Sequence, residues 1–182
     1  MKSELIREEE MIDFENARLK YKPEVIKFLL IAEAPPKIGS NRFFYFEDVN
    51  EKDTLFIETM KVIYPDEDFS NTKNIRSRKK EFLEKFKYDG FYLIDASDKP
   101  IESKGYKKKQ IKESLPSLIQ KIKSLISSET KIILISKTVY EVCFDKIKSE
   151  GFKVINRSMI PFPIGFQGVY RKELSELTKQ YL

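Results

Sequence analysis

Short segments rich in apolar residues recur four times along the chain, at residues 25–32, 91–94, 132–135 and 153–156. The first contains four large apolar residues in a row, Phe28 to Ile31, and leads directly to Glu33. Short, continuous apolar runs are typical of strands that are buried on both faces, as in a parallel sheet. We therefore predict four buried strands.

The segments between these strands carry apolar residues at the spacing of three and four that is typical of an amphipathic helix. We expect helices over residues 55–63, 77–86, 111–126, 139–147 and 169–181, and an N-terminal helical extension over residues 1–22 that ends before Pro23. Strands that alternate with helices predict a parallel sheet with helices on both faces. The expected fold is a single α/β domain of 182 residues, a three-layer α/β/α sandwich around a central four-stranded parallel sheet.

Polar residues follow the predicted strands where each strand ends. Glu33 follows the first strand, Asp95 ends the second, Ser136 and Lys137 follow the third, and a loop at residues 157–168 follows the fourth. Open α/β sheets bind ligands at the carboxyl ends of their strands. We predict a binding crevice there. The alternative is that Glu33 is an ordinary solvated charge.

Four aromatic residues in a row, Phe43 to Phe46, lie in the loop after the first strand. Two interpretations are open. The rings form a stacking platform for a planar base, or they anchor the loop in the core. A basic run at residues 76–80 has a similar ambiguity, since it either contacts phosphates or forms a solvated surface.

The residue composition excludes several kinds of catalytic and metal-binding site. The chain has no histidine, which excludes Ser-His-Asp hydrolysis and His-ligated metals, and its single cysteine, Cys143, excludes an intrachain disulfide and a Cys-ligated iron–sulfur cluster. We expect no cofactor. No apolar run is long enough to span a membrane, and the N-terminus is too polar for a signal peptide, so a cytoplasmic location is expected. The net charge of +5 fits an anionic partner such as nucleic acid.

Three short motifs lie, in order, at the ends of the first, second and fourth predicted strands. They are Ala-Glu-Ala-Pro-Pro at residues 32–36, Gly-Phe-Tyr-Leu-Ile-Asp at residues 90–95 and Ile-Pro-Phe-Pro-Ile at residues 160–164. In their order and spacing they resemble the motifs of the uracil-DNA glycosylase superfamily, over residues 26–177. Enzymes of that superfamily flip a damaged base out of DNA and excise it.

The resemblance implies a role for each matching residue. Glu33 would position the attacking water, Asp95 would stand at the base-reading position, and Phe44, beside Tyr45, would stack on the base. Ala34 and Pro35 would line the base pocket, and Ile164 would be the apolar wedge in the duplex. Contacts with the DNA would come from Lys107, Lys108, Lys137, Arg157 and Phe162. The implied partner is DNA, either single-stranded or a damaged duplex.

The chain departs from the family pattern in three ways. Ala32 and Pro36 replace the glycines at the edges of the first motif, which narrows close approach to the backbone. Ile160 stands where the family has a histidine that stabilises the leaving base, and Asp95 stands where it has a base-reading asparagine. An ionised aspartate only accepts hydrogen bonds, so it favours a base edge rich in donors over uracil. The sequence therefore supports a glycosylase with shifted specificity, or a non-catalytic nucleic-acid- or nucleotide-binding module on the same fold. A generic nucleotide-binding protein ranks last, because no glycine-rich phosphate loop is present.

Overall fold

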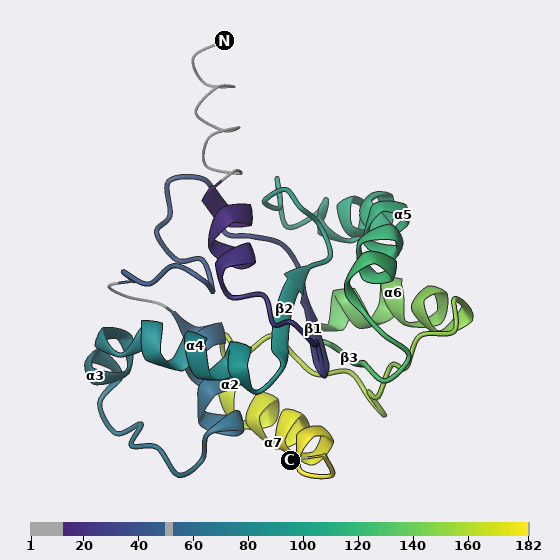
Figure 1. Cartoon of the computed structure of the whole chain (residues 1–182). Helices are drawn as coiled ribbons and strands as arrows, with labels where there is room; N and C mark the ends of the chain where they lie inside the picture. The colour runs from purple at the N-terminus through teal and green to yellow at the C-terminus, as the bar shows by residue number, and fades with distance from the viewer. Residues whose placement is uncertain (1–12, 50–52, 182) are drawn as a thin grey trace.

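A three-stranded parallel sheet forms the centre of the protein. The computed structural model describes residues 13–49 and 53–181, and its strands are β1 (Phe28–Ala32), β2 (Phe91–Asp95) and β3 (Lys131–Leu134). Their order is β2-β1-β3, with Leu30 opposite Leu93 on one side and Ile133 on the other (Figure 1). The predicted α/β class with a parallel sheet is confirmed.

The predicted fourth strand is not formed in the part of the chain that the structure describes. Residues 152–160 run beside β3 but meet it only through isolated bridges, Ile132 to Val154 and Ile135 to Ile160. Between the bridges, the Asn156 side chain takes the place of a backbone ladder. Its Oδ1 accepts from the Leu134 N–H at 2.7 Å, and its Nδ2 donates to the Leu134 carbonyl at 3.0 Å. The prediction of a four-stranded sheet was therefore wrong, because the sheet has three strands.

Helices cover both faces of the sheet. A helix over residues 13–20 precedes β1, within the helical extension predicted for residues 1–22. The first twelve residues of that prediction lie outside the described residues. α5 and α6 pack together on one side of the sheet, and α2, α4 and α7 lie on the other (Figure 1). The helices are α2 (Thr54–Ile63), α3 (Thr72–Ser77), α4 (Lys79–Tyr88), α5 (Lys107–Leu125), α6 (Lys137–Ser149) and α7 (Gln167–Thr178).

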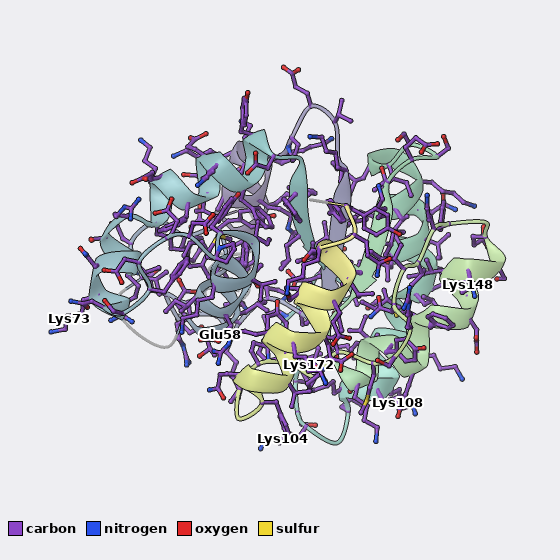
Figure 2. All side chains as sticks on the ribbon, turned by 90° about the horizontal axis from the view of Figure 1, so that it is seen from below. Glu58, Lys73, Lys104, Lys108, Lys148 and Lys172 are labelled. Atoms are coloured by element: carbon purple, nitrogen blue, oxygen red, sulfur yellow. The ribbon has the colours of Figure 1, made fainter. Side chains whose placement is uncertain are left out.

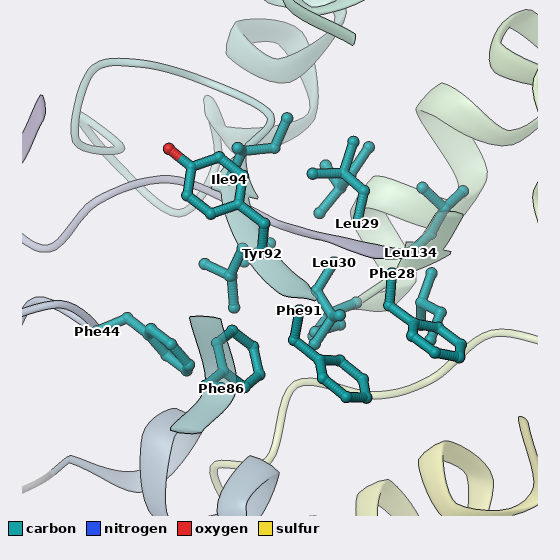
Figure 3. Close-up of a cluster of buried hydrophobic side chains, with 14 of the residues drawn as sticks. Phe28, Leu29, Leu30, Phe44, Phe86, Phe91, Tyr92, Ile94 and Leu134 are labelled. Atoms are coloured by element: carbon teal, nitrogen blue, oxygen red, sulfur yellow. The ribbon is translucent and has the colours of Figure 1, made fainter. Parts of the chain in front are cut away.

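The core explains why the strands read as continuous apolar runs. Every residue of β1 and β2 is buried, because helices cover both faces of these strands. The Phe28 and Phe91 rings stack at 4.7 Å, and Phe86 packs on Phe91 at 5.2 Å (Figure 3). Burial of each such ring contributes roughly 1.5–3 kcal/mol. None of the helices in the described residues is long and apolar enough to cross a membrane.

Candidate functional site

The carboxyl ends of β1 and β2 lie side by side. Ala32 pairs with Asp95 in the parallel register. Beyond the strands, the Ala96 N–H donates to the Ala32 carbonyl at 2.8 Å, and the Ser97 N–H donates to the Glu33 carbonyl at 3.0 Å. The register therefore brings the two predicted acidic residues to the same edge of the sheet.

Glu33 is partly buried and forms an ion pair with the first residue of α5. Its Oε2 lies 2.7 Å from the Nζ of Lys107. The partner is therefore one of the lysines that the resemblance assigned to phosphate. Ala34, which follows, is half-buried, and Pro35 is buried and offers no N–H to a ligand.

Asp95 is buried and does not face solvent. Its Oδ2 lies 3.2 Å from Nη2 of Arg18, a buried residue of the helix over 13–20. Burial raises the pKa of the Asp95 carboxyl to about 6, while the Arg18 guanidinium acts in the opposite direction. At neutral pH the carboxylate is therefore mainly ionised and already holds an internal cation.

The aromatic run anchors the loop in the core, which decides between the two interpretations. The Phe44 ring packs on Tyr45 at 5.0 Å, Phe56 at 5.5 Å and Phe86 at 5.6 Å, and it points toward Phe86 in Figure 3. The Tyr45 hydroxyl accepts from the Leu93 N–H at 2.7 Å. Phe44 and Tyr45 therefore have no free face for a base, and the expectation that they stack on one is corrected.

All three lysines assigned to DNA have an acidic partner, and that of Lys107 is Glu33. Lys108 and Lys137 share Glu141, at 2.9 and 3.6 Å. Arg157 is exposed beside a small cavity of about 90 Å³. Only Arg157 of the predicted phosphate contacts makes no ion pair with a described residue.

Other cations on the loops that leave β1 and β2 are exposed and make no ion pair within residues 13–49 and 53–181. They are Lys37 and Arg42 after β1, and Lys99 and Lys104 after β2, with Lys104 labelled at the rim of the molecule in Figure 2. The sequence shows them only as scattered loop residues. Both loops start at the same edge of the sheet, because β1 and β2 are parallel and Ala32 lies opposite Asp95.

The loop before α7 mixes buried and exposed apolar residues. Ile160 is buried, and its carbonyl accepts from the Ser136 N–H at 2.8 Å. Phe162 packs partly against the core, whereas Ile164 is 67% exposed and Phe166 is 57% exposed. Ile164 is therefore accessible, as a wedge requires, but Phe162 is largely occupied in packing.

No metal centre is apparent in the described part of the chain, since no three His, Cys, Asp or Glu side chains there are grouped to hold an ion. Comparisons with protein-family models, with curated proteins and with solved structures found no match to this chain. The similarity to uracil-DNA glycosylases stays a prediction from the sequence motifs.

Proposed function

We propose that this protein binds DNA at the carboxyl edge of its sheet, as a nucleic-acid-binding module of the uracil-DNA glycosylase type. The observation that carries the proposal is a set of exposed cations on the two loops beside Glu33 that make no ion pair with any residue in the described ranges: Lys37, Arg42, Lys99 and Lys104. Cations that are free of acidic partners can neutralise phosphates without first losing an ion pair.

The exposed Ile164 supports the same proposal. A large apolar side chain in water gains by burial, and an apolar wedge between base pairs is a common device of proteins that bend or open DNA. Ile164 lies in the loop after Ile160, which bridges to Ile135 just beyond the end of β3. The loop therefore starts beside the same edge of the sheet.

Three features favour binding over base excision. Phe44 is packed in the core, Asp95 is paired with Arg18, and Ile160 offers no donor to a leaving base. Loss of one preorganised donor to a developing anion costs about 2.7–4 kcal/mol of transition-state stabilisation. These residues do not supply the usual route for expelling a base.

Base excision is the second candidate, and the Glu33–Lys107 pair favours it. A partly exposed carboxylate can orient water by accepting a hydrogen bond from it and can act as a general base, and the neighbouring ammonium can stabilise a developing anion. In this role Asp95 would read a donor-rich base edge only after Arg18 had left it.

A base-release assay on the variant Glu33→Gln separates the two functions. Single-stranded and duplex DNA carrying uracil, hypoxanthine, xanthine or an alkylated base is incubated with protein, and abasic sites are then cleaved by alkali. The proposal expects no strand breaks with either protein, and DNA affinity that Glu33→Gln keeps or raises, because a charge that repels phosphate is removed. Breaks that disappear in Glu33→Gln would establish the enzyme instead.

A further inference from the structure

A groove of about 520 Å³ lies between α2 and α7, and none of its lining residues belongs to the carboxyl edge. One side is the end of α2 and the residues after it, and the other is α7. Figure 2 shows α7 across the front of the molecule with Lys172 on it, and Glu58 of α2 nearby. The lining residues are Lys61, Val62, Ile63, Pro65, Arg171, Lys172, Ser175, Thr178 and Lys179.

The groove is strongly basic. Four of its lining residues are cations, and none of the described residues that line it is acidic. Lys61 and Arg171 both pair with one buried carboxylate, Glu58. Lys172 and Lys179 are exposed and make no ion pair with a residue in the described ranges. One acid therefore balances four cations.

The groove is also apolar on the side of α2. Val62 is half-buried, Ile63 is buried, and Pro65 beyond the helix is exposed. A buried hydrogen bond of 2.7 Å between Thr59 Oγ1 and the Tyr170 hydroxyl joins α2 to α7, close in sequence to the lining residues Lys61 and Arg171. The surface is therefore preformed and does not need to be ordered when a ligand arrives.

We propose that this groove docks an acidic peptide segment of a partner protein. An apolar side chain of the peptide would pack on Val62 and Pro65, while its carboxylates would face Lys172 and Lys179. Charge complementarity selects an anionic partner, and the apolar wall favours an amphipathic peptide, which presents apolar and acidic groups together. A nucleic acid backbone brings phosphates but no matching apolar side chains. This surface acts independently of DNA binding at the carboxyl edge.

The probe is a fluorescein-labelled 12-residue peptide with leucines at helical spacing and glutamates between them, measured by fluorescence anisotropy. We expect the charge reversal Lys172→Glu/Lys179→Glu to weaken binding about tenfold, as the loss of two charge pairs predicts. Val62→Ser should also weaken peptide binding, because it removes an apolar contact on the α2 side of the groove. Lys148→Glu, at an exposed position of α6 labelled on the right of Figure 2, is the control for a charge change elsewhere and should have no effect.

Several outcomes would overturn the proposal. They are no binding of the peptide, equal binding of a peptide with glutamine in place of glutamate, or equal losses in Lys148→Glu. Tighter binding of a 12-nucleotide single strand that is also lost in Lys172→Glu/Lys179→Glu would assign the groove to nucleic acid. Thermal unfolding verifies that the variants fold, and the affinity of Lys172→Glu/Lys179→Glu for DNA at the carboxyl edge should stay unchanged.

Discussion

Arg18 and Asp95 form a buried ion pair although they stand 77 positions apart in the chain. Arg18 Nη2 lies 3.2 Å from Asp95 Oδ2, and Arg18 Nη1 lies 2.8 Å from Glu15 Oε2. The Arg18 guanidinium also lies over the Phe43 ring, 5.7 Å from its centroid. The pair therefore fastens the helix over residues 13–20 to the end of β2 and closes the carboxylate off from ligands.

We expect Arg18→Met to destabilise the protein by about 3–5 kcal/mol, because it leaves the buried Asp95 carboxylate without its cation. Urea unfolding at pH 7 measures the loss. The double variant Arg18→Met/Asp95→Asn should lose much less than the sum of the single variants, because neither charge remains buried alone. Additive losses would show that the two residues do not stabilise each other.

The pH dependence of stability tests the burial of Asp95. Its pKa is raised from 3.8 to about 6 in the folded protein, mainly by desolvation. The folded state therefore binds a proton more tightly than the unfolded chain, and the stability that this provides is present below about pH 4 and lost as the pH rises through about 6. We subtract the free energy of unfolding of Asp95→Asn from that of the unaltered protein at each pH. This difference should fall by up to about 3 kcal/mol as the pH rises over that interval. A difference that rises with pH would contradict the assignment.

Ser136 is held in a backbone conformation that suits glycine. Its φ is 91° and its ψ 149°, and its hydroxyl caps α6 by accepting from the Val139 N–H at 3.1 Å. Ser136→Gly should raise stability by about 0.5–1 kcal/mol, since glycine relieves the strain and is a tolerable cap. Ser136→Ala, which keeps the strain and loses the cap, should lower it by about 1 kcal/mol. Chemical unfolding of both variants checks the order, and a loss in Ser136→Gly would contradict it.

Substitution of Ile164 tests its proposed role as an apolar wedge between base pairs of the duplex. We expect Ile164→Asp to weaken duplex binding about tenfold or more, because a carboxylate replaces an apolar contact beside phosphates. Stability should change by less than about 0.5 kcal/mol, since the side chain is largely exposed. Val25→Asp is the matched control, because Val25 is 65% exposed and precedes β1 at the opposite edge of the sheet. Equal losses in both variants would mean that only added negative charge matters.

The sequence was sufficient for the central strands and the position of Glu33, because a strand buried on both faces must be apolar throughout. It could not show that the fourth apolar segment, residues 153–156, forms no strand, because the Asn156 side chain takes the place of the expected backbone hydrogen bonds. It could not decide which way Phe44 points, because a core anchor and a stacking platform need the same residues. Nor did it indicate Arg18, whose partner Asp95 is near only in the folded chain.

Lys79 illustrates the same limit. In the sequence it belongs to a basic run, which is typical of a solvated or phosphate-binding surface. In the structure it is fully buried, with Nζ 2.6 Å from Asp53 Oδ2 and donating to the Phe43 carbonyl at 3.2 Å. Its neighbours differ, since Arg78 pairs with Glu67 and Glu81. The direction of each side chain depends on the helix phase and on partners that are far away in sequence.

The most direct test of DNA binding at the carboxyl edge is an anisotropy titration of labelled single-stranded and duplex DNA at several salt concentrations. The variant replaces Lys37, Arg42, Lys99 and Lys104 with glutamine. Its control replaces Lys73, Lys80, Lys148 and Lys153, four exposed cations that also make no ion pair with a described residue. We predict that only the first variant loses affinity, and that its logarithmic salt slope on duplex DNA falls by about three to four. Equal losses in the two variants, or no binding by the unaltered protein, would contradict the account.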